Sequence, residues 1–115
     1  MFDFEKLTVY KKAKEFDRQI IALICSDKFI DKVIANQLKR ASLSIPLNIA
    51  EGTGRYSKAD IKNFYVIARG STFQCIAIFD ILKDRKNINT DVYTDFYNKA
   101  EELSMMLFAM IKRLC

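Results

Sequence analysis

The stretch Ser44-Ile45-Pro46-Leu47-Asn48-Ile49-Ala50-Glu51-Gly52-Thr53-Gly54-Arg55 contains the only proline of the chain and two of its three glycines. It is also where polar side chains enter an otherwise apolar helical run. Proline inside a helix removes a backbone donor and favours a bend, and glycine just after a helix is a common stop because it accepts positive φ. The stretch is therefore expected to end one helix at Glu51 and to begin the next after a short turn.

A helix spanning residues 31–51 carries two apolar faces. The first recurs at steps of three and four residues, which is the spacing of a core-facing stripe; it comprises Ile34, Leu38, Ala41, Ile45 and Ile49. The second lies on the far side and comprises Leu43, Leu47 and Ala50. A surface helix of a monomer needs only one apolar stripe, so the second face predicts a second packing partner, which we interpret as another copy of the chain.

A polar ladder runs between these two faces. Its members are Gln37, Arg40, Ser44, Asn48 and Glu51. At a seam between packing partners such groups are partly desolvated, and leaving a buried polar group unpaired costs roughly 1–3 kcal/mol. Two interpretations follow: either Ser44 and Asn48 satisfy backbone groups around Pro46, or the ladder binds a ligand.

Three more amphipathic helices are expected, at residues 5–25, 57–85 and 91–114. In the third helix, small and apolar residues alternate at steps of three and four, which is the pattern of left-handed bundle packing; they are Ile61, Phe64, Ala68, Ser71, Cys75, Ile78 and Leu82. In the fourth helix every face is apolar from Met105 to Ile111, so this half is expected to be buried all round. Short turns make successive helices antiparallel. The predicted fold is an all-α, up-down antiparallel four-helix bundle, one domain across residues 1–115.

A second apolar stripe also marks the third helix. It contains Gly70, and a mid-helix glycine costs up to ~1 kcal/mol relative to alanine, which predicts close packing by another helix at that point. The side chains expected to join copies of the chain into a homo-oligomer are Leu43, Leu47, Val66, Gly70, Phe73 and Phe108.

Composition excludes most catalytic chemistry. The chain has no histidine, which rules out Ser-His and Cys-His nucleophile pairs, H-E-x-x-H zinc sites and Glu-x-x-His di-iron motifs. No glycine-rich phosphate loop is present. We therefore expect no enzyme, no metal and no cofactor. The three cysteines are odd in number and widely spaced, which predicts a reduced, cytoplasmic protein. No uninterrupted apolar run approaches the ~20 residues of a membrane span, so no membrane partner is expected.

A basic patch is expected at the turn between the second and third helices. Arg55, Tyr56, Lys58 and Lys62 place cations beside an aromatic ring at a helix start, where backbone amides favour phosphate and an aromatic ring can stack on a base. Arg40 of the polar ladder completes the candidate nucleic-acid site. The net charge of +5 permits such a partner without demanding one. The alternative is a solvated turn, in which Arg55 holds Glu51 or a helix-end carbonyl.

Three blocks of the sequence resemble a known family. They are Gln37-Leu38-Lys39-Arg40-Ala41, then Ser44-Ile45-Pro46 with Asn48-Ile49-Ala50-Glu51-Gly52 and Gly54-Arg55, then Ala68-Arg69-Gly70-Ser71. Together they resemble the bacterial four-helix-bundle proteins encoded in intervening sequences of large-subunit ribosomal RNA genes, over nearly the whole chain. The resemblance implies an up-down bundle assembled as a ring-like homopentamer, and a gene context that links the family to RNA. The chain departs from the family at Gln74, where a glutamate is usual, so no role is assigned to a carboxylate there.

Two classes of function follow. The first is a non-enzymatic, oligomeric helical-bundle protein that associates with RNA or DNA through the basic patch. The alternative is a protein-interaction scaffold that presents its surface to another protein and makes no direct contact with nucleic acid.

Overall fold

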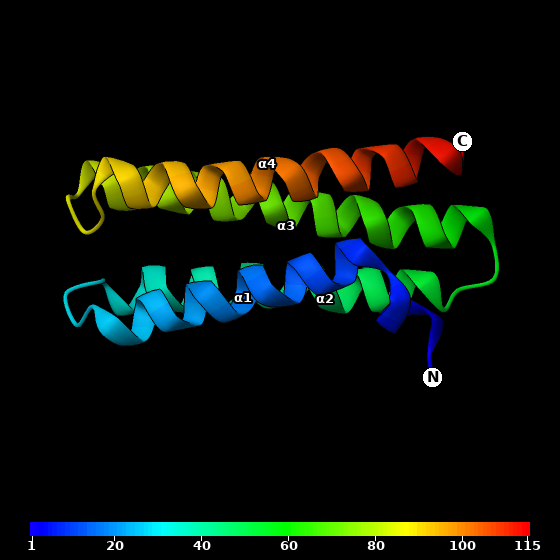
Figure 1. The fold of residues 1–115 in the computed structure, drawn as a ribbon, viewed down its shortest axis with the longest axis horizontal. Helices are drawn as coiled ribbons and strands as arrows, with labels where there is room; N and C mark the ends of the chain where they lie inside the picture. Colours follow the sequence, from blue (N-terminus) through cyan, green and yellow to red (C-terminus); the bar gives the residue numbers. More distant parts are fainter.

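The structure is a computed structural model that describes all residues, 1–115. A 3₁₀ turn, η1 (Asp3–Lys6), precedes four helices: α1 (Thr8–Ser26), α2 (Lys32–Thr53), α3 (Lys58–Asp84) and α4 (Thr90–Arg113). There is no strand. The predicted all-α four-helix fold is confirmed. Successive helices run antiparallel, so that both termini and the α2–α3 turn share one end of the bundle (Figure 1).

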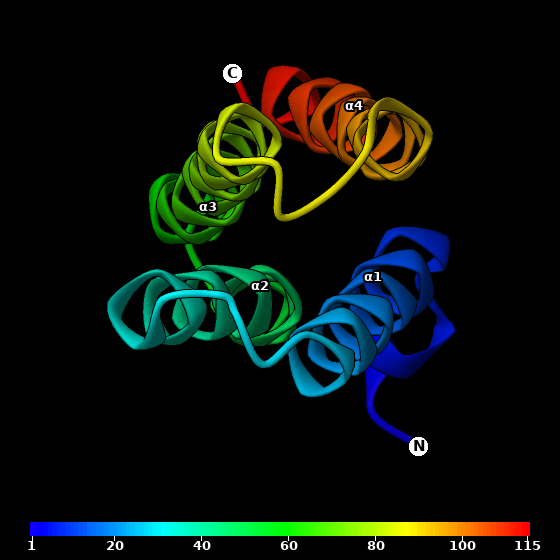
Figure 2. The ribbon, with the colours of Figure 1, turned by 90° about the vertical axis from the view of Figure 1, so that its left-hand side faces the viewer.

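The four helices surround one core (Figure 2). The pair α2–α3 shares the most extensive contact and the pair α1–α4 the least. Phe79 and Phe96 stack with ring centroids 4.5 Å apart, and Phe16 meets Phe96 edge-on at 6.0 Å. Across the more open α1–α4 seam, Lys12 pairs with Glu102 at 3.0 Å. All four helices therefore contribute buried residues to the core, and the seam between α1 and α4 is the most open.

Side-chain caps fix where three of the helices begin. The Asp31 carboxylate accepts from the backbone N–H groups of Val33 and Ile34, and Ser57 Oγ accepts from the N–H of Asp60. The side chain of Asn89 accepts from Val92 N–H, which makes Asn89 the residue before α4. The first helix begins later than expected, at Thr8, because the residues before it form η1 and Leu7 is extended. These caps satisfy donors that a helix start leaves free.

Gly52 has a different role from the one expected. The helix does not stop there but continues to Thr53, and no glycine in the chain has positive φ. Instead, a Cβ at Gly52 would lie 2.8 Å from Phe64 Cβ and 3.0 Å from the Tyr65 ring. Gly52 is therefore required by the close approach of α2 to the start of α3, not by the geometry of a helix stop.

Lys86 is the one residue with positive φ, at 63°. It follows α3, and the N–H of Asn87 donates to the carbonyl of Leu82 at 2.9 Å. This is the arrangement in which glycine usually ends a helix. A lysine in this conformation costs roughly 1–2 kcal/mol relative to glycine.

Candidate functional site

The centre of the polar ladder is satisfied within the chain. Ser44 Oγ and Ser71 Oγ lie 2.8 Å apart and join α2 to α3. Asn48 Nδ2 donates to the carbonyl of Ser44 at 2.8 Å and to its hydroxyl at 2.9 Å. No buried side-chain nitrogen or oxygen lacks a hydrogen-bond partner. These contacts favour the structural interpretation, in which the ladder stabilises the helix around Pro46 and its seam with α3.

The remaining members of the ladder do not join this network. Gln37 and Arg40 are exposed on α2. Glu51 instead forms an ion pair with Arg55, four residues further on. The Arg55 guanidinium also lies over the Phe64 ring, 4.7 Å from its centroid. Arg55 therefore holds the α2–α3 turn, which is the role that the solvated-turn alternative assigns to it.

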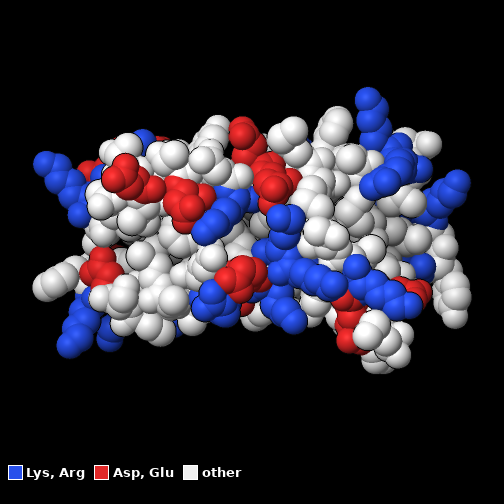
Figure 3. Space-filling model, viewed as in Figure 1, with Lys and Arg blue, Asp and Glu red and all other residues white.

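The structure brings together most of the predicted basic patch. Arg55 and Tyr56 lie in the α2–α3 turn, and Lys58 and Lys62 lie in the first turns of α3. Tyr56 is fully exposed. Arg40 is not part of this group, because it precedes the end of α2 by 13 residues, or about 20 Å along the helix. Figure 3 shows Lys and Arg side chains projecting from the end that holds both termini, although others lie along the bundle and at its opposite end.

The six predicted interface residues are all exposed on three neighbouring helices. With two apolar neighbours that the sequence interpretation missed, they form a surface that we call the apolar band: Leu43, Leu47, Val66, Ile67, Gly70, Phe73, Met105 and Phe108. The contact between Ser44 and Ser71 places the α2 members beside those of α3. The band thus continues across α2, α3 and α4.

Two expectations about this surface are corrected by the structure. The second half of α4 is not buried all round: Met105 is 66% exposed and Phe108 50%, because no helix of the same chain covers that face. Gly70 is not packed against another helix of the same chain either, since a Cβ placed on it would meet nothing within 4 Å. Close packing against α3 explains why position 52 is a glycine, but nothing within the chain explains the glycine at position 70.

The apolar band gives α3 an unusual composition. By length and composition alone, α3 could cross a membrane: it has 27 residues and a mean hydropathy of 1.3 over its most apolar window. Only 44% of that window is buried inside the bundle. The helix is therefore apolar on its core-facing side and also on its outer side.

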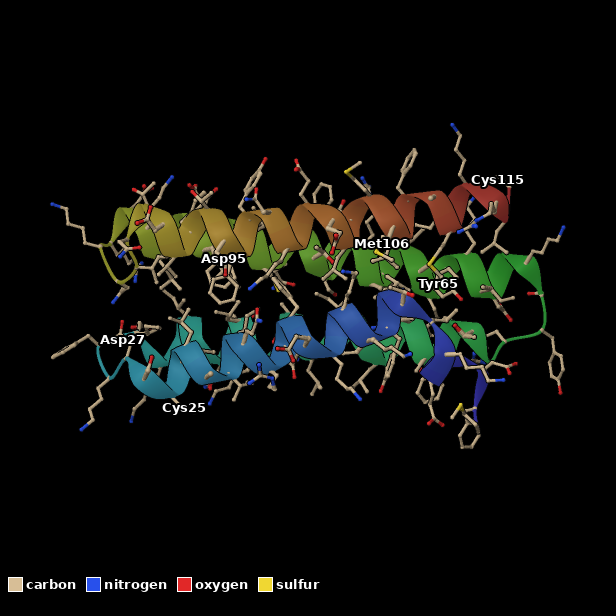
Figure 4. All side chains as sticks on the ribbon, in the orientation of Figure 1. Cys25, Asp27, Tyr65, Asp95, Met106 and Cys115 are labelled. Carbon is tan, nitrogen blue, oxygen red and sulfur yellow. The ribbon has the colours of Figure 1, made fainter.

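The three cysteines of the chain differ in exposure. Cys75 is fully buried, and burial, together with the negative charge of Asp17, raises the pKa of its thiol to about 12. It is therefore uncharged at neutral pH and unreactive. Cys25 and Cys115 are exposed and lie toward opposite ends of the bundle (Figure 4). No group of three His, Cys, Asp or Glu side chains is placed to hold a metal ion.

Comparison with known proteins agrees with this architecture. A solved structure from Bacteroides thetaiotaomicron VPI-5482, described as a protein of unknown function from the S23 ribosomal protein family, superposes with a TM-score of 0.86 at 26% identity. The match covers 91% of this chain and 99% of that one. No curated protein sequence matches significantly. A family profile described as "23S rRNA-intervening sequence protein" matches residues 5–109. The chain therefore belongs to the 23S rRNA-intervening sequence protein family.

Proposed function

We propose that the protein is a non-enzymatic assembly protein whose copies associate through the apolar band into a ring, five copies by the family resemblance. The observation that carries the proposal is the exposure of large apolar side chains on three adjacent helices: Leu47 is 57% exposed, Phe73 56% and Phe108 50%. Scattered exposed apolar residues are ordinary, but a continuous patch usually marks an interaction site.

Sedimentation velocity at 1–100 µM protein tests the assembly. We expect the wild-type chain to form a single larger species, and Phe73→Glu to be monomeric, because it places a charge inside the interface. Phe29→Glu is the matched control, since Phe29 is 90% exposed in the α1–α2 turn and lies outside the band. A monomeric wild-type chain across this range would refute self-assembly and leave the scaffold function, in which the band binds another protein.

A second candidate function is association with RNA or DNA at the basic end. The motivating observation is the fully exposed Tyr56 between Arg55 and Lys58, at the end of the bundle that also carries Lys112 and Arg113. In a closed ring these ends would lie on one face, so each copy would add cations to the same surface. Phosphate binding of this kind weakens steeply as salt concentration rises.

Titrating structured RNA, single-stranded DNA and double-stranded DNA at several salt concentrations tests this function. Lys58→Ala is expected to weaken binding and to reduce the salt slope, with the melting temperature unchanged, because the lysine is exposed and makes no ion pair. Arg55→Ala is the contrasting variant. It removes the ion pair to Glu51 and the contact with Phe64, so we expect it to destabilise the fold by about 1 kcal/mol. Binding that is independent of salt, or unchanged in Lys58→Ala, would count against a phosphate site at this turn.

A further inference from the structure

Arg69 is an arginine whose charge has no partner in the chain. It is the only charged residue in α3 between Lys62 and Asp80. Its guanidinium lies between two rings of the apolar band, 4.8 Å from the centroid of Phe73 and 5.2 Å from that of Phe108. None of the ion pairs in the structure includes it.

The contacts of Arg69 hold its guanidinium in one orientation but provide no carboxylate to pair with its charge. Arg69 Nε donates to the carbonyl of Ser104 on α4 at 3.2 Å, and the two terminal nitrogens make no hydrogen bond. Stacking on aromatic rings holds the plane of a guanidinium, and a held guanidinium with free terminal nitrogens is suited to bind a carboxylate through two parallel hydrogen bonds. Beside it lies a groove of about 210 Å³ between α3 and α4, lined by residues that include Phe73, Tyr97 and Ser104.

The opposite edge of the apolar band offers one carboxylate. Glu51 is the only acidic residue between Asp31 and Asp60, so it is the only one on α2. It lies one helical turn beyond Leu47, and its side chain is 52% exposed. The hydrogen bond from Arg55 occupies Oε2 and leaves Oε1 free. Because a carboxylate has about four acceptor positions, Glu51 can accept a second guanidinium.

Glu51 and Arg69 also lie at similar heights along the bundle. Gly52, the residue after Glu51, packs against Tyr65 on α3. Arg69 follows Tyr65 by four residues, which is about 6 Å of helix. They do not pair within one chain, because Arg69 faces α4 and Glu51 belongs to α2 on the other side of α3. If two copies lie side by side with their axes parallel, Arg69 of one copy and Glu51 of the other are at similar heights along the bundle.

Resting on the proposed self-assembly, we infer that Arg69 of one copy binds Glu51 of the next copy, in a head-to-tail contact between the α3–α4 edge of the band and its α2 edge. A two-fold symmetric contact centred on Gly70 would instead bring two Arg69 side chains together without a carboxylate. A head-to-tail contact uses two different surfaces and therefore builds a ring when its rotation closes. The interface would then carry one charge pair within an apolar surround.

Reversing the two charges, singly and together in one chain, tests this pairing. In an assembly of Arg69→Glu alone, the new glutamate of one copy faces Glu51 of the next copy. In an assembly of Glu51→Arg alone, the new arginine faces Arg69 of the neighbouring copy. Each pure variant is therefore expected to raise the dissociation constant for assembly by about 100-fold or more. The double variant Arg69→Glu/Glu51→Arg exchanges the two charges within one chain. Every head-to-tail contact then again joins Glu to Arg, whatever the number of copies in the ring, so we expect assembly to return to within about tenfold of wild type. The measurement is sedimentation velocity of each sample at equal total concentration.

Three controls separate this inference from the proposed self-assembly. Arg85→Glu changes the net charge equally at the far end of α3 and should leave assembly unchanged. Circular dichroism and thermal melts show whether each variant is folded. If Arg69→Glu does not fold, Arg69→Gln and Glu51→Gln take its place: each should weaken assembly at least tenfold, and the double variant should be no weaker than either single one.

The possible outcomes are distinguishable. If Phe73→Glu dissociates the assembly while Arg69→Glu does not, the charge pair is refuted and self-assembly stands. If each single charge reversal dissociates the assembly and the double variant Arg69→Glu/Glu51→Arg does not recover it, the two residues do not meet and the inference is again refuted. A monomeric wild-type chain refutes both self-assembly and this pairing.

Discussion

Replacing Gly70 by alanine should change two measurable quantities in opposite directions. Gly70 lies in the interior of α3, on its exposed outer face, and an added Cβ would meet nothing within 4 Å. In such a position alanine is preferred over glycine by roughly 0.5–1 kcal/mol, because glycine loses more backbone freedom on folding. The folded monomer should therefore become more stable. If a neighbouring helix approaches at Gly70, the same methyl group should weaken assembly.

The monomer must be measured apart from the assembly, because association itself stabilises the folded state. Phe73→Glu supplies a background in which the chain is expected to be monomeric. In that background we expect Gly70→Ala to raise the free energy of unfolding in urea by roughly 0.5–1 kcal/mol, and the melting temperature by a few degrees. In the wild-type background we expect it to raise the dissociation constant by at least tenfold.

Gly52→Ala is the matched control, since it makes the same chemical change on α2. Its Cβ would lie 2.8 Å from Phe64 Cβ, so the methyl group must displace a packed helix. Overpacking of this kind costs about 1–3 kcal/mol, more than the gain in helix propensity. The reasoning fails if Gly70→Ala destabilises the monomer, or if both alanine variants change stability in the same direction. Unchanged assembly in Gly70→Ala would remove Gly70 from the interface.

Four further predictions concern the fold. Lys86→Gly should increase the free energy of unfolding by roughly 0.5–1 kcal/mol. Glycine avoids the cost of about 1–2 kcal/mol of a φ of 63° but loses more backbone freedom on folding; a decrease in urea melts would contradict this. Asn48→Ala should cost about 1–3 kcal/mol, since it removes both hydrogen bonds from Asn48 to Ser44; a loss below ~0.5 kcal/mol would return the ladder to the ligand-binding interpretation. A thiol reagent at pH 8 should react at once with Cys25 and Cys115 and with Cys75 only on unfolding. Folding raises the pKa of Cys75 from 9.0 to about 12. The contribution of this thiol to the free energy of unfolding is therefore complete below pH 9, and it is lost as pH rises from 9 toward 12. Between pH 8 and 10 the wild-type chain should therefore lose about 1 kcal/mol more than Cys75→Ala.

Periodicity predicts many of the residues that face the core, although in α3 it misses Tyr65 and Phe79, which are also buried. The alternation of three- and four-residue steps in α3 identifies Ala68, Cys75 and Leu82, all of them buried. It does not reveal how closely two helices approach, because that distance depends on side chains from both. For this reason the sequence predicts a helix stop at Gly52, whereas in the structure the missing side chain of Gly52 lets Phe64 of α3 pack closely against α2.

The candidate site was predictable in part for the same physical reason. A second apolar stripe on α2 and α3 can be seen in the sequence, and the structure exposes it. The partners of polar groups cannot be seen, because they come from other helices: Ser44 meets Ser71, 27 positions away, and Arg69 meets the carbonyl of Ser104. The lone charge of Arg69 within an apolar segment was the available signal, and it becomes informative only when Phe73 and Phe108 are seen on either side of it.

The distribution of apolar residues supplies the remaining argument for a partner on this surface. Half of the chain is hydrophobic, but only 26 of its 115 residues are buried, so much of the apolar content lies at the surface. Scattered apolar residues would need no explanation. Here they gather around Gly70, a glycine without a role in the monomer, and beside Arg69, an arginine held in place without a carboxylate. The outer face of α3 therefore combines exposed apolar side chains, a glycine that leaves room for a neighbouring helix and an arginine held in a fixed orientation. These are features of an interface, and mutations there should alter association more than folding.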